Sequence, residues 1–228
     1  MIDITLIDLT DERDTGEYEM KAPPVESFDR EKAPEGQYPI ICTQVIDLGT
    51  HYNQKWEKYQ RKIRFMFLTP HKSKEGEYAG KPLAVLAEFP FSMFCEKGKE
   101  SNLVKFVQSW FGKNFPSQQA ASDFDFTHLL KRPAFANIVH NEGFVNIQTI
   151  MPLMQGQEAP AIPADANVGI FDTGNPDMVF FEKLGKKTQE AIMASAEMGK
   201  KSDEPMPPLE PPIPNEIPDF VDDKEIPF

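Results

Sequence analysis

Aromatic and basic side chains are interleaved in the segment that runs from residue 52 to residue 64. Its members are Tyr52, Lys55, Trp56, Lys58, Tyr59, Arg61, Lys62 and Arg64. Proteins that bind single-stranded nucleic acids combine flat rings, on which bases stack, with cations that follow the phosphates. A stacked base contributes about 1–3 kcal/mol whatever its identity, so such binding tolerates any sequence. The segment therefore predicts a binding site for a single strand.

Further residues extend this prediction, and one alternative competes with it. A Lys-, Glu- and Gly-rich stretch over residues 71–81 reads as a loop that adds Lys72, Lys74, Tyr78 and Lys81 to the candidate DNA contacts. Lys113, just beyond an expected helix, is another candidate phosphate contact. The alternative is that Trp56 and Tyr59 are ordinary core or surface residues beside a solvated run of charge.

The end of the chain predicts a second kind of site, for a partner protein. Its candidate residues are Asp222, Asp223, Glu225, Ile226, Pro227 and Phe228. A terminal carboxylate, an apolar ring and upstream acids suit a small hydrophobic pocket ringed by Lys or Arg, and capture of a terminal carboxylate is a known recognition mode. Such an acidic end can also fold back onto the basic groove and compete with DNA. The alternative is a solvated acidic tail without a partner.

The net charge of −12 is unevenly distributed along the chain. Residues 1–35 hold 4 basic and 11 acidic side chains, and residues 201–228 hold 2 and 8. The segment 36–200 holds 18 and 17, and therefore has a net charge of only +1. We expect an acidic N-terminal arm (1–35), a nucleic-acid-binding domain with a helical extension (36–200) and a disordered, proline-rich acidic tail (201–228).

Catalytic and metal-binding patterns are absent from the sequence. The four histidines are scattered, and there is no HExxH motif, Gly-rich phosphate loop or CxxC pair. Cys42 and Cys95 are expected to be buried free thiols. No apolar run is long enough to span a membrane, and the acidic N-terminus does not resemble a signal peptide. We therefore expect a cytoplasmic protein that is not an enzyme and has no cofactor and no metal.

The expected elements run in the order strand, strand, strand, helix, strand, strand. Strands are expected over 36–48, 61–68, 82–94, 135–140 and 144–150, with Gly49 and Asn53 in the turn after the first. In the second strand the alternation places Ile63, Phe65 and Phe67 on one face and Lys62, Arg64 and Met66 on the other. Most of Phe65, Phe67, Phe89, Phe135 and Phe144 are expected in the core, with one or two facing DNA.

Helical signals follow the third strand and close the domain. Ser101 or Asn102 can cap a helix whose apolar face includes Trp110 and which Gly112 can end. Residues 179–198 predict an amphipathic helix with contacts through Phe180, Phe181, Leu184, Ile192 and Met193. The element order is that of a mainly β, five-stranded OB-fold barrel with its helix between strands three and four. A small mixed α+β sandwich shares this order and stays open as the alternative.

Two separate segments also resemble known proteins. The terminal Asp222–Phe228 resembles the end of bacterial-type single-stranded DNA-binding proteins, where acids precede Ile-Pro-Phe. Residues 101–155, with Ser109-Trp110-Phe111-Gly112-Lys113, and the opening Gly36-Gln37-Tyr38 are similar to phage-encoded OB-fold single-stranded DNA-binding proteins. Two departures are Phe111, where that family leads us to expect a basic residue, and Lys224 within the acidic run.

The resemblance implies a function in DNA replication, recombination and repair. The protein would coat and protect single-stranded DNA in the cytoplasm of a phage-infected bacterium and recruit replication or recombination proteins through its tail. Rival interpretations are an adaptor that binds protein but not DNA, a single-stranded RNA-binding protein, and a small nuclease, although no metal-binding carboxylate cluster is apparent. The sequence leaves the oligomeric state open.

Overall fold

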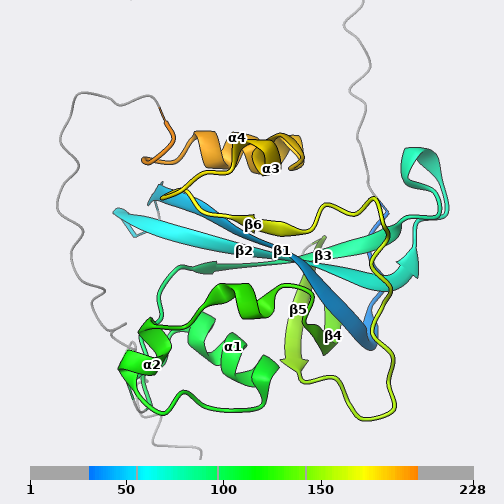
Figure 1. Cartoon of the computed structure of the whole chain (residues 1–228), viewed down its shortest axis with the longest axis horizontal. Helices are drawn as coiled ribbons and strands as arrows, with labels where there is room; N and C mark the ends of the chain where they lie inside the picture. The colour runs from blue at the N-terminus through cyan, green and yellow to red at the C-terminus, as the bar shows by residue number, and fades with distance from the viewer. Residues whose placement is uncertain (1–30, 55, 97, 142, 200–228) are drawn as a thin grey trace, which may run out of the picture. The chain divides into compact units, whose positions relative to one another are not determined.

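The protein is mainly β, as the sequence predicts (Figure 1). The computed structural model describes residues 31–54, 56–96, 98–141 and 143–199, so Lys55, most of the N-terminal arm and the whole C-terminal tail lie outside the described residues. Six strands form one sheet: β1 (Gly36–Asn53), β2 (Lys58–Lys72), β3 (Pro82–Pro90), β4 (Pro133–Asn141), β5 (Phe144–Met151) and β6 (Gly169–Phe171). The main path is β3-β2-β1-β4-β5, antiparallel throughout.

Helical segments lie on both sides of this sheet (Figure 1). The longest is α1 (Asn102–Phe111), which follows β3 as predicted. The others are α2 (Gln118–Ser122), α3 (Met178–Glu182), α4 (Lys186–Met193) and the 3₁₀ turns η1 (Gly76–Tyr78) and η2 (Phe126–Leu129). Among the described residues, no helix is long and apolar enough to cross a membrane.

Strand β1 is the central element because it pairs with three other strands. One edge pairs with β2 from Ile41 to Asn53. The other edge pairs first with β4, over residues 36–41, and then with β6 in parallel, over residues 44–46. Past β6, the amide of Ala196 donates to the carbonyl of Thr50 at 2.9 Å. The segment from β6 to residue 199, called the C-terminal extension below, thus covers the part of the β1 edge that β4 leaves open. This matters because an uncovered edge would expose unpaired backbone groups.

The main hydrophobic core lies between the sheet and α1. Ser101 caps α1 by accepting a hydrogen bond from the amide of Val104, and Gly112 ends it with a φ of 65°. Trp110 is fully buried on the apolar face of the helix, and its indole nitrogen donates to the carbonyl of Pro133 at 3.1 Å. Its packing against Phe67 confirms the core role predicted for this residue.

A second apolar cluster lies on the other face of β1. It consists of Ile46, Leu48, Phe171, Phe180, Phe181, Leu184 and Ile192. Sequence periodicity predicts one helix over 179–198, but the structure has two short ones, because α3 ends at Glu182 and α4 begins after Gly185, its N-cap. Four of the five predicted contacts are buried; the fifth, Met193, is exposed, so that assignment is wrong.

Two more expectations differ from the structure. Gly49 does not end the first strand; it sits at a register shift between β1 and β2 with a φ of 77°, and the strand continues to Asn53. A Cβ atom there would lie 2.5 Å from the Cβ of Ser195, so the close approach of the extension requires glycine. Residues 31–35, expected in the arm, contact the domain: Ala33 is buried and Pro34 accepts a hydrogen bond from Tyr38.

A buried carboxylate ties the extension to the two central strands. Asp47 on β1 accepts hydrogen bonds from Nε and Nη2 of Arg61, at 3.1 and 2.6 Å, and from the amide and hydroxyl of Thr173 just beyond β6. Burial alone would raise the pKa of Asp47, but the hydrogen bonds from Arg61, Thr173 and the amide of Gly49 outweigh it and hold the pKa below its ordinary value of 3.8.

We expect Asp47→Asn to lower the free energy of unfolding by about 2 kcal/mol, because hydrogen bonds to a charged group are lost while Arg61 keeps partial access to water. Urea unfolding at pH 7 measures this, with Asp165→Asn, an exposed acid, as the matched control. Because the pKa of Asp47 is depressed in the folded state, its contribution is complete above pH 3.8 and is lost at lower pH. A difference between wild type and Asp47→Asn that stays constant down to pH 2 would contradict this account.

Candidate nucleic-acid interface

The β1–β2 hairpin extends the two central strands beyond the part that the helices cover (Figure 1). The strands stay paired up to Asn53 and Lys58, and a short turn joins them. Within the turn, the amide of Trp56 donates to the carbonyl of Asn53 at 3.3 Å, and Glu57 takes a positive φ of 49°. A regular ladder therefore holds this end of the hairpin in a defined shape.

Three aromatic rings at the hairpin end are largely exposed. Tyr52 is 53% exposed, Trp56 63% and Tyr59 49%. Tyr52 and Tyr59 are directly opposed across the ladder, and their rings meet edge to face with centroids 5.3 Å apart. Isolated exposed apolar residues need no explanation, but a group of large rings at one site indicates a binding surface. Trp56 and Tyr59 are therefore not core residues; the alternative that they are ordinary surface residues beside a solvated run of charge stays open.

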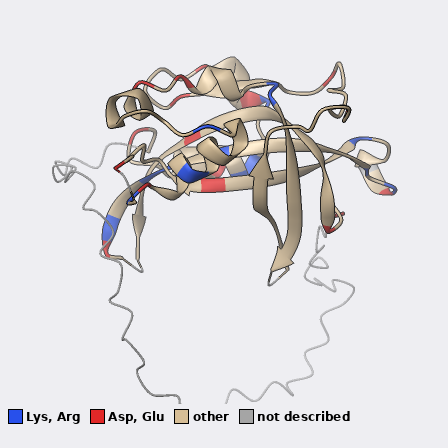
Figure 2. Cartoon of the chain, turned by 90° about the horizontal axis from the view of Figure 1, so that it is seen from below, with Lys and Arg blue, Asp and Glu red and all other residues tan. Residues whose placement is uncertain are grey.

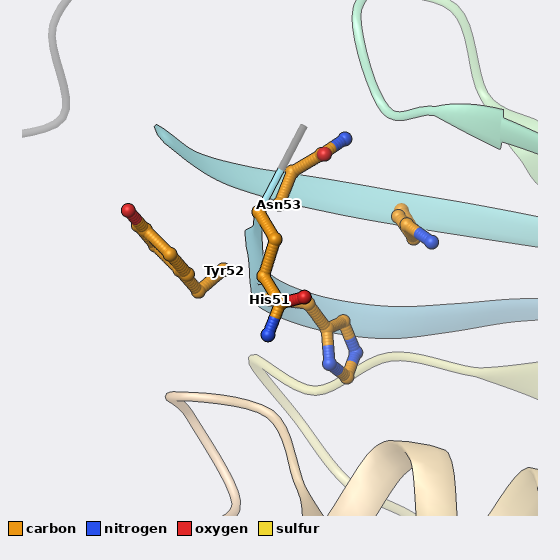
Figure 3. Close-up of a pocket in the computed structure, with 5 residues that line it drawn as sticks. His51, Tyr52 and Asn53 are labelled. Atoms are coloured by element: carbon orange, nitrogen blue, oxygen red, sulfur yellow. The ribbon is translucent and has the colours of Figure 1, made fainter. Parts of the chain in front are cut away.

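The hairpin end also forms a shallow hollow. A cavity of about 320 Å³ is lined by His51, Tyr52, Asn53, Gln54 and Lys62, and Figure 3 shows the side chains around it. The imidazole Nε2 of His51 lies 2.9 Å from the carbonyl of Leu48, which fixes the ring against the strand. The hollow is small and open, and it supplies contact surface beside the rings.

Strand alternation divides the basic side chains of β2 between two faces. Ile63, Phe65 and Phe67 are buried toward the main core, as predicted from the sequence. Tyr59 and Arg61 belong to the same side of the strand, whereas Lys58, Lys62 and Arg64 belong to the other. The cluster that is continuous in sequence is therefore split between two faces of one ribbon.

Carboxylates hold most of these cations. Arg61 binds Asp47, and its Nη2 lies 3.6 Å from Oδ1 of Asp172. Its guanidinium carbon lies 5.2 Å from the ring centroid of Phe91.

The other two cations of the cluster on β2, Lys62 and Arg64, both pair with Glu88 on β3. Figure 2 shows the same arrangement in outline, with acidic and basic segments side by side on the sheet. The expected basic outer face is present, but it is largely neutralised.

The other predicted contacts are distributed over the domain and do not gather at the hairpin end. Lys72 and Lys74 lie at the opposite end of β2, where they line a second hollow of about 460 Å³. Lys81 lies 5.9 Å from the ring centroid of Tyr78 and 3.7 Å from Asp165. Lys113 is exposed just beyond the C-cap of α1. The six partner-binding residues of the tail lie outside the described residues.

Two features of the surface were not found from the sequence. Glu88 is a neighbour of Arg64 only because of the β2–β3 register, which pairs these two residues directly. Phe144, the first residue of β5, is 72% exposed, and the sequence did not indicate which of the five phenylalanines would lie outside the core. Among the predicted phenylalanines, Phe65 and Phe67 are fully buried, and Phe89 and Phe135 are partly buried.

Metal-binding and thiol chemistry find no support in the described part of the chain. There, no group of three or more His, Cys, Asp or Glu residues could hold a metal ion. Cys42 is buried, and burial raises the pKa of its thiol far above the ordinary range. Cys95 is partly buried, and its sulfur lies 3.7 Å from the amide nitrogen of Gln108. Comparison of the chain with protein-family models, with curated proteins and with solved structures found no match.

The two tryptophans allow a direct test of the exposed ring. Trp110 is fully buried and Trp56 is largely exposed, so only the second should be accessible to a dissolved quencher such as iodide. We expect Trp56→Phe to remove nearly all of the iodide-quenchable fluorescence and to leave the blue-shifted emission of Trp110. Quenchable fluorescence that survives in Trp56→Phe would contradict the exposure assigned to these rings.

Proposed function

We propose that this protein binds single-stranded DNA without sequence preference, through the end of the β1–β2 hairpin. The single observation that carries the proposal is the group of three exposed rings, Tyr52, Trp56 and Tyr59, on one rigid hairpin. Aromatic rings stack on any base, because every base has a flat π-face. A single strand exposes those faces and a duplex does not, so this site discriminates by strandedness.

Cations near the rings supply the contacts to phosphate. Lys58 is exposed and follows the turn directly before Tyr59, and Lys62 and Arg64 share the face of Lys58, which is the face of β2 opposite Tyr52 and Tyr59. Each phosphate contact releases condensed counterions, so affinity falls as the salt concentration rises, with a slope of about −0.7 per contact for single strands. With few cations at the hairpin end, the proposed binding depends more on stacking than on charge.

The arrangement of the strands supports an OB-fold barrel as the architecture. The order β3-β2-β1-β4-β5, with α1 between β3 and β4, is the order that this fold requires. The two outer strands, β3 and β5, approach one another, which is the side on which the barrel would close. In OB folds the β1–β2 connection is one of the loops that contact nucleic acid, in agreement with the proposed site.

The acidic tail supplies the second half of the proposed function. Its final residues, Asp222 to Phe228, would recruit replication or recombination proteins and would also compete with DNA for the basic side chains. Together these activities suit a phage-encoded protein that protects single strands in the host cytoplasm during replication, recombination and repair. The proposal for the tail rests on its sequence alone.

Removal of the rings tests the stacking site. We expect Tyr52→Ala/Trp56→Ala/Tyr59→Ala to weaken binding of labelled oligo-dT at least about 100-fold, since each ring contributes about 1–3 kcal/mol. Fluorescence anisotropy at low salt measures this, with oligo-U as competitor to compare RNA. Phe144→Ala removes an even more exposed ring from another hairpin and should change affinity less than about twofold. An equal loss of affinity in the triple variant and in Phe144→Ala, or no binding of oligo-dT by the wild-type protein, would refute the site.

Deletion of residues 201–228 tests the competition by the tail. The segment carries 8 acidic and 2 basic residues, a net charge of −6, so its removal takes away an acidic competitor. We expect the shortened protein to bind oligo-dT several-fold more tightly at low salt, with the difference disappearing as salt screens the tail. Unchanged affinity at low salt would leave the tail with partner recruitment alone.

A further inference from the structure

Glu88 lies between two cations on the face of β2 opposite Tyr59. Its Oε1 accepts a hydrogen bond from Nζ of Lys62 at 3.0 Å. Its Oε2 accepts two from Arg64, from Nε at 3.1 Å and from Nη2 at 2.8 Å. One carboxylate therefore occupies the donors of two basic side chains, and both partners come from the same face of β2.

The two cations form a fork that matches a phosphate as well as a carboxylate. Arg presents its donors in a rigid plane suited to either anion, and Lys adds a point charge beside it. Arg64 is also held from the other side, because its Nη1 donates to the hydroxyl of Thr188 on α4 at 3.1 Å. This contact does not involve Glu88, so the guanidinium keeps its place if the carboxylate moves away.

The fork is partly open to solvent. Glu88 and Lys62 are each about one-third exposed, whereas Arg64 is only 17% exposed and is well fixed. Leu86, two residues before Glu88 on the same face of β3, is 48% exposed and provides apolar surface next to the fork. Burial opposes ionisation of Glu88, but its bonds to Arg64 and Lys62 prevail and hold its pKa below the ordinary value, so it is charged at neutral pH.

We propose that Glu88 occupies a phosphate position between Lys62 and Arg64, and that bound single-stranded DNA displaces it. This inference rests on the proposed function and assigns a regulatory role to one residue of that site. In the unbound protein the carboxylate keeps the two cations in place and limits their attraction for other anions. A DNA phosphate that enters the fork must replace Glu88, which lowers the affinity of this face for a single strand.

The test compares Glu88→Gln with a control that removes the same charge elsewhere. Glu75→Gln alters an exposed acid near the far end of β2. We expect Glu88→Gln to bind oligo-dT about tenfold more tightly than wild type at low salt, with a steeper salt dependence by about 0.7 for each added phosphate contact. Glu75→Gln should change affinity less than twofold. Thermal unfolding establishes that each variant is folded.

A second background shows whether Glu88 acts through the fork. In Lys62→Met/Arg64→Met protein, adding Glu88→Gln should no longer raise affinity, because the donors that it frees are missing. Glu88→Asp keeps the charge but withdraws the carboxylate by one methylene, so it should raise affinity about twofold to threefold. This variant carries the test if Glu88→Gln does not fold.

The outcomes separate this inference from the proposed function. Suppose that the wild-type protein binds oligo-dT through the rings and that Glu88→Gln binds it no more tightly than Glu75→Gln does. This result overturns the role of Glu88 and leaves the proposed function standing. An equal gain in the Lys62→Met/Arg64→Met background also overturns it, because the effect is then one of general charge. Wild-type protein that does not bind oligo-dT removes the basis of both proposals.

Discussion

The structure depends on one strand, β1, whose two edges must both be hydrogen-bonded. One edge of this strand pairs with β2 from Ile41 to Asn53, and the other edge is shared among β4, β6 and the segment around Ala196. A buried strand cannot leave amides and carbonyls without partners. The C-terminal extension is therefore an integral part of the fold, since it completes the edge that β4 covers only as far as Ile41. Asp47 is buried on this strand. Its carboxylate binds Thr173 of the extension and Arg61 of β2, and so links both to β1.

The same arrangement explains why the hairpin end stays available. α1 packs on one face of the sheet, and α3 and α4 pack on the other (Figure 1), and neither apolar cluster includes a residue of β1 beyond Leu48. Beyond them, β1 and β2 remain paired but lose their cover, so side chains that would enter a core elsewhere in the strand face solvent. Tyr52 and Tyr59 are consequently held by the hydrogen-bonded ladder without being buried, and Trp56 lies in the turn that joins the two strands. That combination is what a stacking site needs, because its geometry is set before a ligand arrives.

The basic side chains of β2 are mostly neutralised by neighbouring carboxylates, so their number alone does not set the charge of the strand. Arg61 is committed to Asp47 and serves the fold, whereas Lys62 and Arg64 share Glu88 on a face that water reaches. The first pair is anchored by a carboxylate that is almost fully buried, so it is not free to exchange partners. The second is partly exposed and has a separate support in Thr188. Adjacent cations in one strand can therefore have different roles, which their spacing alone does not reveal.

Local patterns in the sequence were sufficient for much of the fold. Period-two alternation identified the buried face of β2, and helical spacing with Ser101 and Gly112 identified α1, because these signals arise from neighbouring residues. The three-residue β6 and the break at Gly185 were missed, since pairing with β1 and packing against Leu48 determine them. The sequence by itself determined which side chains, rings and cations, occur close together near residue 58. Only the tertiary structure decided which of them face solvent and which carboxylates hold them, because strand register brings Asp47 and Glu88 from other strands to β2.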